Sequence, residues 1–404
     1  MTATGPNTLV DCGLPLFFAV SNPGATGIAA PSLRMGDALR TSVRSFSGFQ
    51  KEALVVSART GLMWRLASDE GPYLNGHDAA PCPLAFLTAG MIASYMNEIT
   101  ALARQRGCKI RRLRLVQDNF YTMQGSMPKR TMVGGALPVE LTVEIDCDLA
   151  GTALNQLIMD AVHASPINGL MRGKLESLFA LAKNGKQLQP AKVAALAGAI
   201  YPDPGDRFEE AKPAAGLSAS GLVWANGTTP KKDVAGGTAS VASSLAAEQN
   251  RTLNIGGICT LREDGLKEIT QLQYSPHGTS FKFLSEEAPQ NGGQGRAPDA
   301  NTLMSAGIGF CFMTQFGRFV SMLKLDLQDY RIVQDTHFSL GGASGATGKE
   351  GEAAPVETHV YLTTTESDDI AREMLDISEQ TCFLHAFCRT DLKPKVKIVQ
   401  GAFG

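Results

Sequence analysis

The chain lacks the features that define membrane, secreted and nucleic-acid-binding proteins. Its 404 residues hold eight cysteines, too few for a disulfide framework, and no Cys-x-x-Cys pair that would suggest zinc. No apolar run approaches about eighteen residues, and the apolar stretch at 14–20 has no basic flank before it. The net charge is −2 without blocks of one sign. We therefore expect a cytoplasmic chain without a signal peptide, and neither nucleic acid nor a membrane as its partner.

What the sequence does contain is a repeat at one fixed spacing. Val116-Gln117-Asp118, for example, returns as Val333-Gln334-Asp335, and we call this separation the repeat spacing. Because the register holds without a gap, the sequence predicts two copies of one fold. The copies differ in sulfur at two positions, where Ser94 and Ser165 of the first copy correspond to Cys311 and Cys382 of the second.

The length agrees with two domains, since units of about 150 residues are near the commonest domain size. We expect an N-terminal extension at 1–35, a first domain at 36–186, a linker at 187–250 and a second domain at 251–404. The linker is rich in Pro, Gly, Ala and Ser, which favours irregular structure apart from a short helix near 191–199.

Both halves show the same order of three strands, a helix, two strands and a helix. In the first half we expect strands at 42–49, 53–57, 61–67, 110–118 and 139–146, with helices at 84–104 and 152–164. In the second half we expect strands at 253–261, 268–274, 279–284, 330–338 and 356–363, with helices at 301–323 and from 368 onward. This order predicts an α+β fold in which long central helices pack on antiparallel sheets.

The segment around Cys311 resembles the OsmC/Ohr family, the osmotically inducible and organic-hydroperoxide-resistance thiol peroxidases. The resembling residues are Gly292-Gly293, Ala297-Pro298, the apolar helix at 303–313 and Gln380-Thr381-Cys382. In that family a reactive cysteine lies within a central apolar helix, and a second cysteine lies near the end of the other long helix. The resemblance covers most of each half. It implies two tandem OsmC-like domains that form a pseudo-two-fold intramolecular dimer, and leaves further association of chains open.

The resemblance implies roles for the two cysteines of the second copy. It makes Cys311 the attacking thiol and Cys382 the resolving thiol. Ser165-Pro166 is typical of a helix start, so Cys382 at the equivalent position would also lie at a helix start, where a thiolate is stabilised.

A reactive thiolate needs a positive neighbour that lowers its pKa. Arg44 and Arg262 occupy similar early-strand positions, one residue off the repeat spacing, and the family's thiolate-stabilising arginine also comes from an early strand. The family places a Glu about ten residues before the reactive cysteine, where this chain has Asn301. The nearest acid is Asp299, which lies about 18 Å from Cys311 if one continuous helix joins them.

Other residues receive less specific interpretations. Glu286 and Glu287 are further candidates for holding the arginine, although acids before a Gly-rich loop are usually solvated. The remaining cysteines are expected to be structural, namely Cys12, Cys82, Cys108, Cys147, Cys259 and Cys388. The histidines have no metal-like spacing, so we expect neither a metal site nor a cofactor.

Three functions remain open. The first is a thiol peroxidase that acts on a small apolar hydroperoxide and is restored by a dithiol reductant. The second is a hydrolase or lyase in which Cys311 attacks a carbonyl and Arg44 or Arg262 stabilises the oxyanion. The third is a non-catalytic protein that binds a small molecule.

Overall fold

The computed structural model describes residues 8–205, 207–214, 221–234 and 244–401. Within them the fold is mixed α+β, as the sequence predicts, with six α-helices and two sheets of eight strands each. The helices are α1 (Leu9–Cys12), α2 (Pro83–Gln105), α3 (Gly151–Ala164), α4 (Ala300–Leu323), α5 (Asp368–Thr381) and α6 (Phe383–Arg389). None of these helices is both long and apolar enough to cross a membrane.

The strands fall into two groups by sheet. The first sheet contains β1 (Phe17–Ala19), β4 (Met63–Ser68), β3 (Lys51–Ser57), β2 (Asp37–Ser45), β14 (Asp329–Phe338), β15 (Glu357–Thr363), β8 (Leu178–Lys183) and β9 (Lys186–Leu188), in that order. The second contains β10 (Val223–Thr228), β13 (Thr279–Ser285), β12 (Lys267–Ser275), β11 (Glu248–Leu261), β5 (Ile110–Ser126), β7 (Glu140–Cys147) and β16 (Lys395–Gln400), and β6 (Val133–Ala136) pairs with β5.

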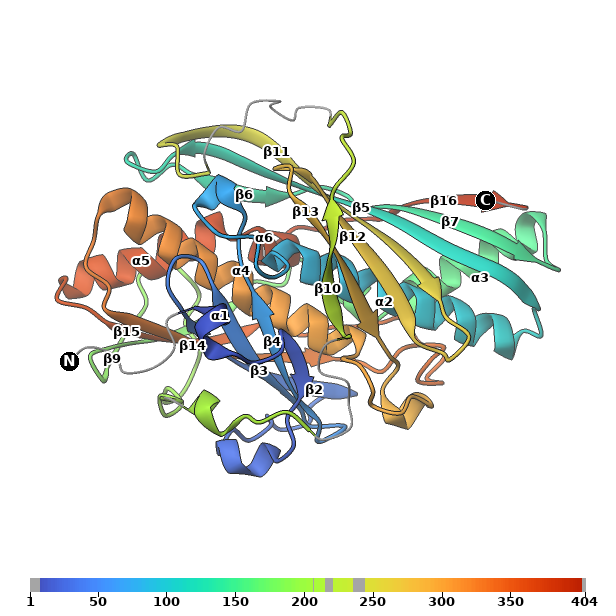
Figure 1. Ribbon diagram of the computed structural model, residues 1–404, viewed down its shortest axis with the longest axis horizontal. Coiled ribbons are helices and arrows are strands. Elements are labelled where there is room, and N and C mark those ends of the chain that lie inside the picture. Colours follow the sequence, from blue (N-terminus) through green and yellow to red (C-terminus); the bar gives the residue numbers. More distant parts are fainter. Residues whose placement is uncertain (1–7, 206, 215–220, 235–243, 402–404) are drawn as a thin grey trace.

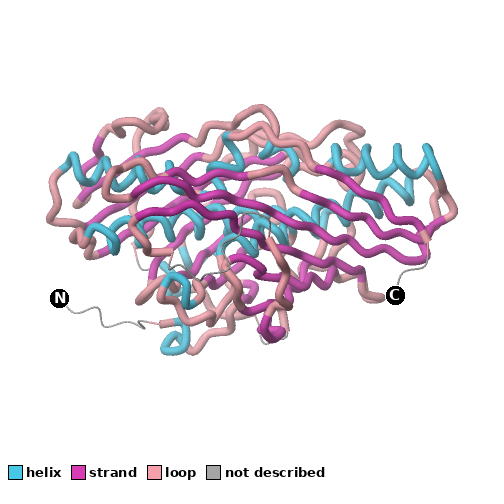
Figure 2. The backbone as a smooth tube through the Cα atoms, turned by 90° about the horizontal axis from the view of Figure 1, so that it is seen from above, coloured by secondary structure: helices cyan, strands magenta, loops and turns pink. Residues whose placement is uncertain are grey.

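The two long helices lie between the two sheets (Figure 1). Helix α4 packs on β2, β3 and β14 of the first sheet, α2 packs on β5, β11 and β12 of the second, and the helices pack on each other. Figure 2 shows long strands running side by side along the length of the molecule. One hydrophobic core extends through all these layers, because both helices are apolar on nearly every side.

The helices approach closely at Gly90 of α2 and Gly307 of α4. A Cβ added at Gly90 would lie 2.8 Å from the carbonyl oxygen of Ala300, and one added at Gly307 would lie 2.9 Å from the Cβ of Phe86. Packed interiors do not accommodate contacts this short without a shift. Glycine at these two positions therefore permits the crossing that places α4 and its cysteine in the centre of the molecule.

Each sheet contains strands from both halves of the sequence. In the first sheet β2 pairs antiparallel with β14, and β15 pairs parallel with β8. In the second sheet β11 pairs antiparallel with β5, and β16 pairs parallel with β7. The segments expected as domains at 36–186 and 251–404 therefore interlock, and the sheets are not purely antiparallel as the sequence suggested.

The bounds of several elements recur at the repeat spacing. Helix α3 corresponds in this way to α5, and β8 corresponds to β16, residue for residue. The strands β8 and β16 extend the repeated order beyond the second helix, which we did not anticipate. Tandem duplication predicts such agreement, and the duplication itself stays a prediction.

The linker differs from its expected structure where it is described. No helix lies at 191–199, because the backbone N–H groups of Lys192 and Val193 donate to the carboxylate of Asp376 instead of to a helical turn. Strand β10 lies in the same linker and pairs with β13. The N-terminal extension contributes β1 to the first sheet, and its residues 1–7 lie outside the described part.

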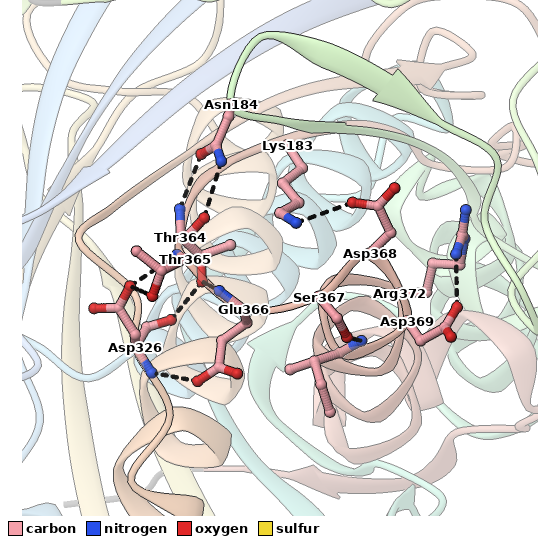
Figure 3. A network of polar contacts seen from close by, with 11 residues as sticks. Lys183, Asn184, Asp326, Thr364, Thr365, Glu366, Ser367, Asp368, Asp369 and Arg372 are labelled. Atoms are coloured by element: carbon pink, nitrogen blue, oxygen red, sulfur yellow. Dashed lines mark hydrogen bonds and ion pairs between the residues drawn. The ribbon is translucent and has the colours of Figure 1, made fainter.

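The start of α5 is fixed by a network of polar contacts (Figure 3). The side chain of Ser367 caps the helix by accepting from the backbone N–H of the third residue after it. Lys183 of β8 binds Asp368 at 2.9 Å, and Asn184 and Thr364 exchange hydrogen bonds. These contacts tie α5 to the first half of the chain, and thereby position the far end of the helix.

Candidate functional site

Cys311 and Cys382 meet where α5 ends and α6 begins. Cys382 closes α5 and is the N-cap of α6, whereas Cys311 lies in the middle of α4. Their thiols are close enough that each shifts the pKa of the other, and both are free rather than joined in a disulfide. The structure thus brings together the two cysteines that the sequence singled out.

The two thiols differ in how readily they ionise. Burial raises the pKa of Cys311 well above its usual value, and the hydrogen bond with Cys382 adds to the effect. Burial also opposes ionisation of Cys382, but its contacts with Cys311 and with His385 outweigh burial and lower the pKa of Cys382. The His385 ring packs 4.8 Å from the ring of Phe312 and 5.4 Å from that of Phe179. The pair therefore loses its first proton from Cys382.

A small cavity of about 30 Å³ lies beside Cys311. It has room for about one water-sized molecule. Cys311 lines this cavity, whereas Cys382 does not. A molecule in the cavity therefore contacts Cys311 rather than Cys382.

Glu70 is a buried carboxyl in the wall of this cavity. It accepts hydrogen bonds from the hydroxyls of Thr314 at 2.9 Å and Tyr73 at 2.7 Å, and the Nζ of Lys51 lies 3.8 Å away. Burial raises the pKa of Glu70 and lowers the pKa of Lys51, although each opposes the shift of the other. Glu70 and Lys51 belong to the first half of the chain, and Thr314 lies on α4, so both halves build the wall.

Arg251 and Arg318 supply positive charge at the cavity. Arg318 of α4 donates to the carbonyl oxygen of Ser244 at 2.7 Å, whereas the buried Nε of Arg251 on β11 has no hydrogen-bond partner among the described residues. Burial lowers the pKa of Arg251 to about 10 and that of Arg318 to about 9, so both are protonated at neutral pH. Arg251 is thus a cation with an unused donor in the wall of the Cys311 cavity.

Comparison with known proteins identifies the region that holds both cysteines. Residues 293–397, which are 105 of the 404 residues, match the family model of OsmC-like proteins. This region is OsmC-like. The resemblance inferred from the helix of Cys311 is confirmed for these residues.

Solved structures also match this chain. A crystal structure of an OsmC-like hydroperoxide resistance protein from Jannaschia sp. CCS1 is 20% identical to this chain, with a TM-score of 0.21. The match covers 33% of this chain and 85% of that chain. No curated protein matches the sequence.

The structure does not bring Arg44 or Arg262 to the cysteines of the OsmC-like region. Arg44 binds Glu52 at 2.7 Å, on the opposite face of β2 from Val43, whose side chain lies against α4. Side chains alternate along a strand, so Arg44 points away from α4. Arg262 follows the end of β11 and binds Asp264 at 3.2 Å. Neither arginine lines the cavity beside Cys311.

Asp299 also lies away from Cys311. It is the N-cap of α4 and accepts a hydrogen bond from the backbone N–H of Thr302 at 2.7 Å. Helix α4 is unbroken, so about three turns separate Asp299 from Cys311. Asp299 instead lines a second small cavity, together with Glu98 and Ser94. Burial raises the pKa of Asp299 to about 6.

This second cavity corresponds to the first at the repeat spacing. The hydroxyls of Ser94 and Ser165 form a 2.7 Å hydrogen bond at the positions equivalent to the two cysteines. The walls also correspond, with Glu287 for Glu70, Asp299 for Cys82 and Glu98 for Gln315. The described lining of the second cavity is thus more acidic, and it contains no sulfur.

Sequence reasoning missed several residues of the Cys311 cavity. At the repeat spacing Arg251 corresponds to Arg34, and Glu70 corresponds to Glu287, so the register contained a signal for both. Cys82, which we expected to be structural only, also lines the cavity, and burial raises its pKa to about 12. No cluster of three or more His, Cys, Asp or Glu side chains in the described part is arranged to hold a metal ion.

Proposed function

We propose that this protein is a thiol peroxidase that reduces hydroperoxides with Cys311 as the attacking thiol and Cys382 as the resolving thiol. The observation that supports this proposal best is the contact between two free thiols, only one of which faces a cavity. Arg251, with an unused donor in the same cavity, takes the role first assigned to Arg44 or Arg262. In this proposal the chain is a tandem duplication in which only the second copy keeps its sulfur.

The first half of the cycle uses the hydrogen bond between the two sulfurs. The Cys382 thiolate accepts the proton of Cys311, and the Cys311 thiolate attacks the terminal oxygen of R–O–O–H. A sulfur–oxygen bond forms as the O–O bond breaks, which gives a sulfenic acid and an alkoxide. The alkoxide takes the proton held by Cys382 and leaves as the alcohol. Arg251 stabilises the negative charge that passes from sulfur to oxygen.

The second half of the cycle removes the sulfenic acid. The Cys382 thiolate attacks the sulfur of Cys311, a disulfide forms, and the released hydroxide is protonated to water. One hydroperoxide and two thiols thus give one alcohol, one water and one disulfide. An external dithiol restores both thiols by exchange, without a cofactor.

The size of the cavity bears on the substrate. As it stands, the space of about 30 Å³ beside Cys311 accommodates a peroxide group without a bulky organic substituent. Ser244 lines this cavity and its N–H donates to the carbonyl oxygen of Tyr73 at 2.8 Å, and the next residue, Leu245, packs on Phe49 and Tyr73. We infer that this segment moves when an organic hydroperoxide enters, because the space is too small for the organic group.

Counting thiols tests the proposal. Adding one equivalent of an organic hydroperoxide to the fully reduced protein should remove two thiols and link Cys311 to Cys382. Cys382→Ser should lose only one thiol and complete a single turnover, because its sulfenic acid is not resolved. Cys311→Ser should not react, whereas Cys259→Ser, which changes a buried cysteine outside the cavity, should behave like the parent.

Two results would replace the proposal. Multiple turnover by Cys311→Ser would show that another group attacks the peroxide. If no thiol is lost, but alkylation of Cys311 abolishes the hydrolysis of a carbonyl substrate, the hydrolase alternative is correct.

A further inference from the structure

A cavity of about 480 Å³ lies outside the thiol site. It is bounded by the C-terminal part of α2, by the turn between β11 and β12 and by the loop that follows β13. It adjoins the cavity of the serine pair, with which it shares Asn97, Glu287, Asn291 and Ser344. Its volume is within the range of small-molecule binding sites, and no step of the proposed peroxidase cycle uses it.

Lys267 of β12 lines this cavity and is only 3% exposed. Its ammonium group makes no hydrogen bond or ion pair with any described residue, although its backbone pairs with the neighbouring strands. Burial lowers the pKa of Lys267, and the carboxylate of Glu287 is the charge that opposes this most strongly. The cavity therefore contains a nearly buried amine without a partner in the described part of the protein.

Lys267 differs from the three other lysines and arginines that are as deeply buried in the described chain, although the less deeply buried Arg251 also lacks a hydrogen-bond partner at its Nε. The other three all have partners: Lys51 donates to the carbonyl oxygen of Phe49, Arg65 binds Glu52, and Arg318 donates to the carbonyl oxygen of Ser244. A buried charge without a partner is destabilising. Sites that retain such a charge are characteristically functional, because a ligand supplies the missing partner.

The remaining charges of the cavity define what fits beside Lys267. Arg296 and Glu286 neutralise each other, since the Nε of Arg296 donates to a Glu286 oxygen at 2.9 Å. Glu287 accepts one hydrogen bond at 2.8 Å, from Asn291, which leaves its second carboxylate oxygen without a partner among the described residues. The cavity thus presents the nearly buried ammonium group of Lys267 and one partly used carboxylate near each other, with the exposed Arg104 at its edge.

We propose that this cavity binds a small zwitterion of the α-amino acid class. The carboxylate of the ligand pairs with the ammonium group of Lys267, and the ammonium group of the ligand pairs with Glu287. A simple carboxylate would be repelled by Glu287, and a simple amine would be repelled by Lys267. A zwitterion satisfies both groups at once.

Calorimetric titration of the reduced, full-length protein with each of the twenty L-amino acids tests the proposal. At least one should bind, and acetate, propionate and methylamine should not. Lys267→Met and Glu287→Gln should each weaken binding by about tenfold or more, because each removes a charge-assisted contact. Lys282→Met is the matched control, since Lys282 lies on the neighbouring strand β13 and is paired with Glu268 outside the cavity.

Thermal denaturation separates lost binding from lost folding. Lys267→Met should be at least as stable as the parent, because methionine removes the buried charge and keeps the length of the side chain. It should also keep full peroxidase activity, so failure of this proposal is distinguishable from failure of the peroxidase proposal. The proposal is overturned if no amino acid binds, if Lys267→Met binds as well as the parent, or if simple carboxylates bind equally well.

Discussion

At the scale of single residues, the cysteine with the lowered pKa is not the cysteine that lines the cavity. Cys382 has the lowered pKa, whereas Cys311 lines the cavity. The lowered pKa of Cys382 depends in part on His385, which is close in sequence on α6, whereas Arg251 beside Cys311 comes from β11, which is distant in sequence. In the proposed cycle the two thiols therefore have different roles, and the interaction between them couples their protonation.

Arg251 provides the sharpest residue-scale prediction. Arg251→Met should lower kcat/KM for a hydroperoxide by roughly tenfold to a hundredfold, because a hydrogen bond to a charged group contributes about 1.5–3 kcal/mol. It should also slow alkylation of Cys311 by iodoacetamide, measured by mass spectrometry of the Cys311 peptide. Arg262→Met is the control, since Arg262 is 45% exposed and paired with Asp264. If Arg251→Met is as active as the parent and Arg44→Met has a lowered kcat/KM, Arg44 rather than Arg251 is the arginine that stabilises the thiolate.

At the scale of secondary-structure elements, the crossing of α2 and α4 determines where the thiol lies. Cys311 is the fourth residue after Gly307, one turn along α4 from the closest approach of the helices. A change in helix separation at Gly307 therefore moves the sulfur relative to α6 and to the cavity wall.

Replacement of Gly307 tests this geometry. Gly307→Ala should lower the free energy of unfolding by about 1–3 kcal/mol, because the new methyl group would lie 2.9 Å from the Cβ of Phe86 and 3.2 Å from the backbone nitrogen of Leu87. Gly317→Ala is the matched control on the same helix, where the nearest atoms are the far ends of Phe49 and Tyr330 side chains. At Gly317 an alanine gains about 1 kcal/mol in helix propensity, which offsets the energetic cost of its contacts with the Phe49 and Tyr330 side chains. Urea denaturation of both variants gives the comparison, and equal midpoints would contradict it.

At the scale of the whole molecule, the two halves share both sheets. Strand β11 of the second half depends on β5 of the first half, and β8 depends on β15. Neither half retains an intact sheet when the other is removed.

Fragments of the chain should therefore fold only together. We expect residues 244–404 alone to be unfolded or to associate with a second copy of themselves, since their sheets lose strands from the other half. Co-expression with residues 1–234 should restore a stable one-to-one complex with peroxidase activity. Size-exclusion chromatography and circular dichroism measure both outcomes. A stable, monomeric fragment 244–404 would contradict the shared architecture.

Glu98 makes the stability of the whole molecule depend on pH. It is 1% exposed, and burial raises its pKa to about 7, above the value of about 4.3 in an unfolded chain. The folded state therefore binds the Glu98 proton more tightly than the unfolded chain does. The contribution of Glu98 to the free energy of unfolding is complete below about pH 4 and is lost as the pH rises through about 7. The loss is of the order of 3 kcal/mol. Asp299, whose pKa is raised to about 6, adds a change of the same sign.

The pH dependence is tested with Glu98→Gln. The urea midpoint of this variant should fall less steeply between about pH 5 and 7 than that of the parent, because an amide does not titrate in this range. Glu350→Gln serves as the control, since the Glu350 side chain is 67% exposed. If the urea midpoint of Glu98→Gln changes with pH as steeply as that of the parent, groups other than Glu98 cause the pH dependence of stability.

The sequence by itself determined the elements and the cysteine pair. Apolar runs and alternation located α2, α4 and α5 and most of the strands to within a few residues, because local periodicity reflects which side of an element is buried. The repeat drew attention to Cys311 and Cys382, and the OsmC-like resemblance held for residues 293–397.

The tertiary structure decided which charges surround the thiols. Arg44 and Arg251 both lie on strands, and only the pairing of strands from different halves and the alternation of side chains place Arg251 rather than Arg44 at the cavity. From the sequence, only the distance from Asp299 to Cys311 along one continuous helix could be predicted, whereas the cavity that Asp299 lines depends on what packs beside the N-terminus of α4. The unpartnered Lys267 likewise has no signal in the sequence, since burial and missing partners are properties of three-dimensional packing alone.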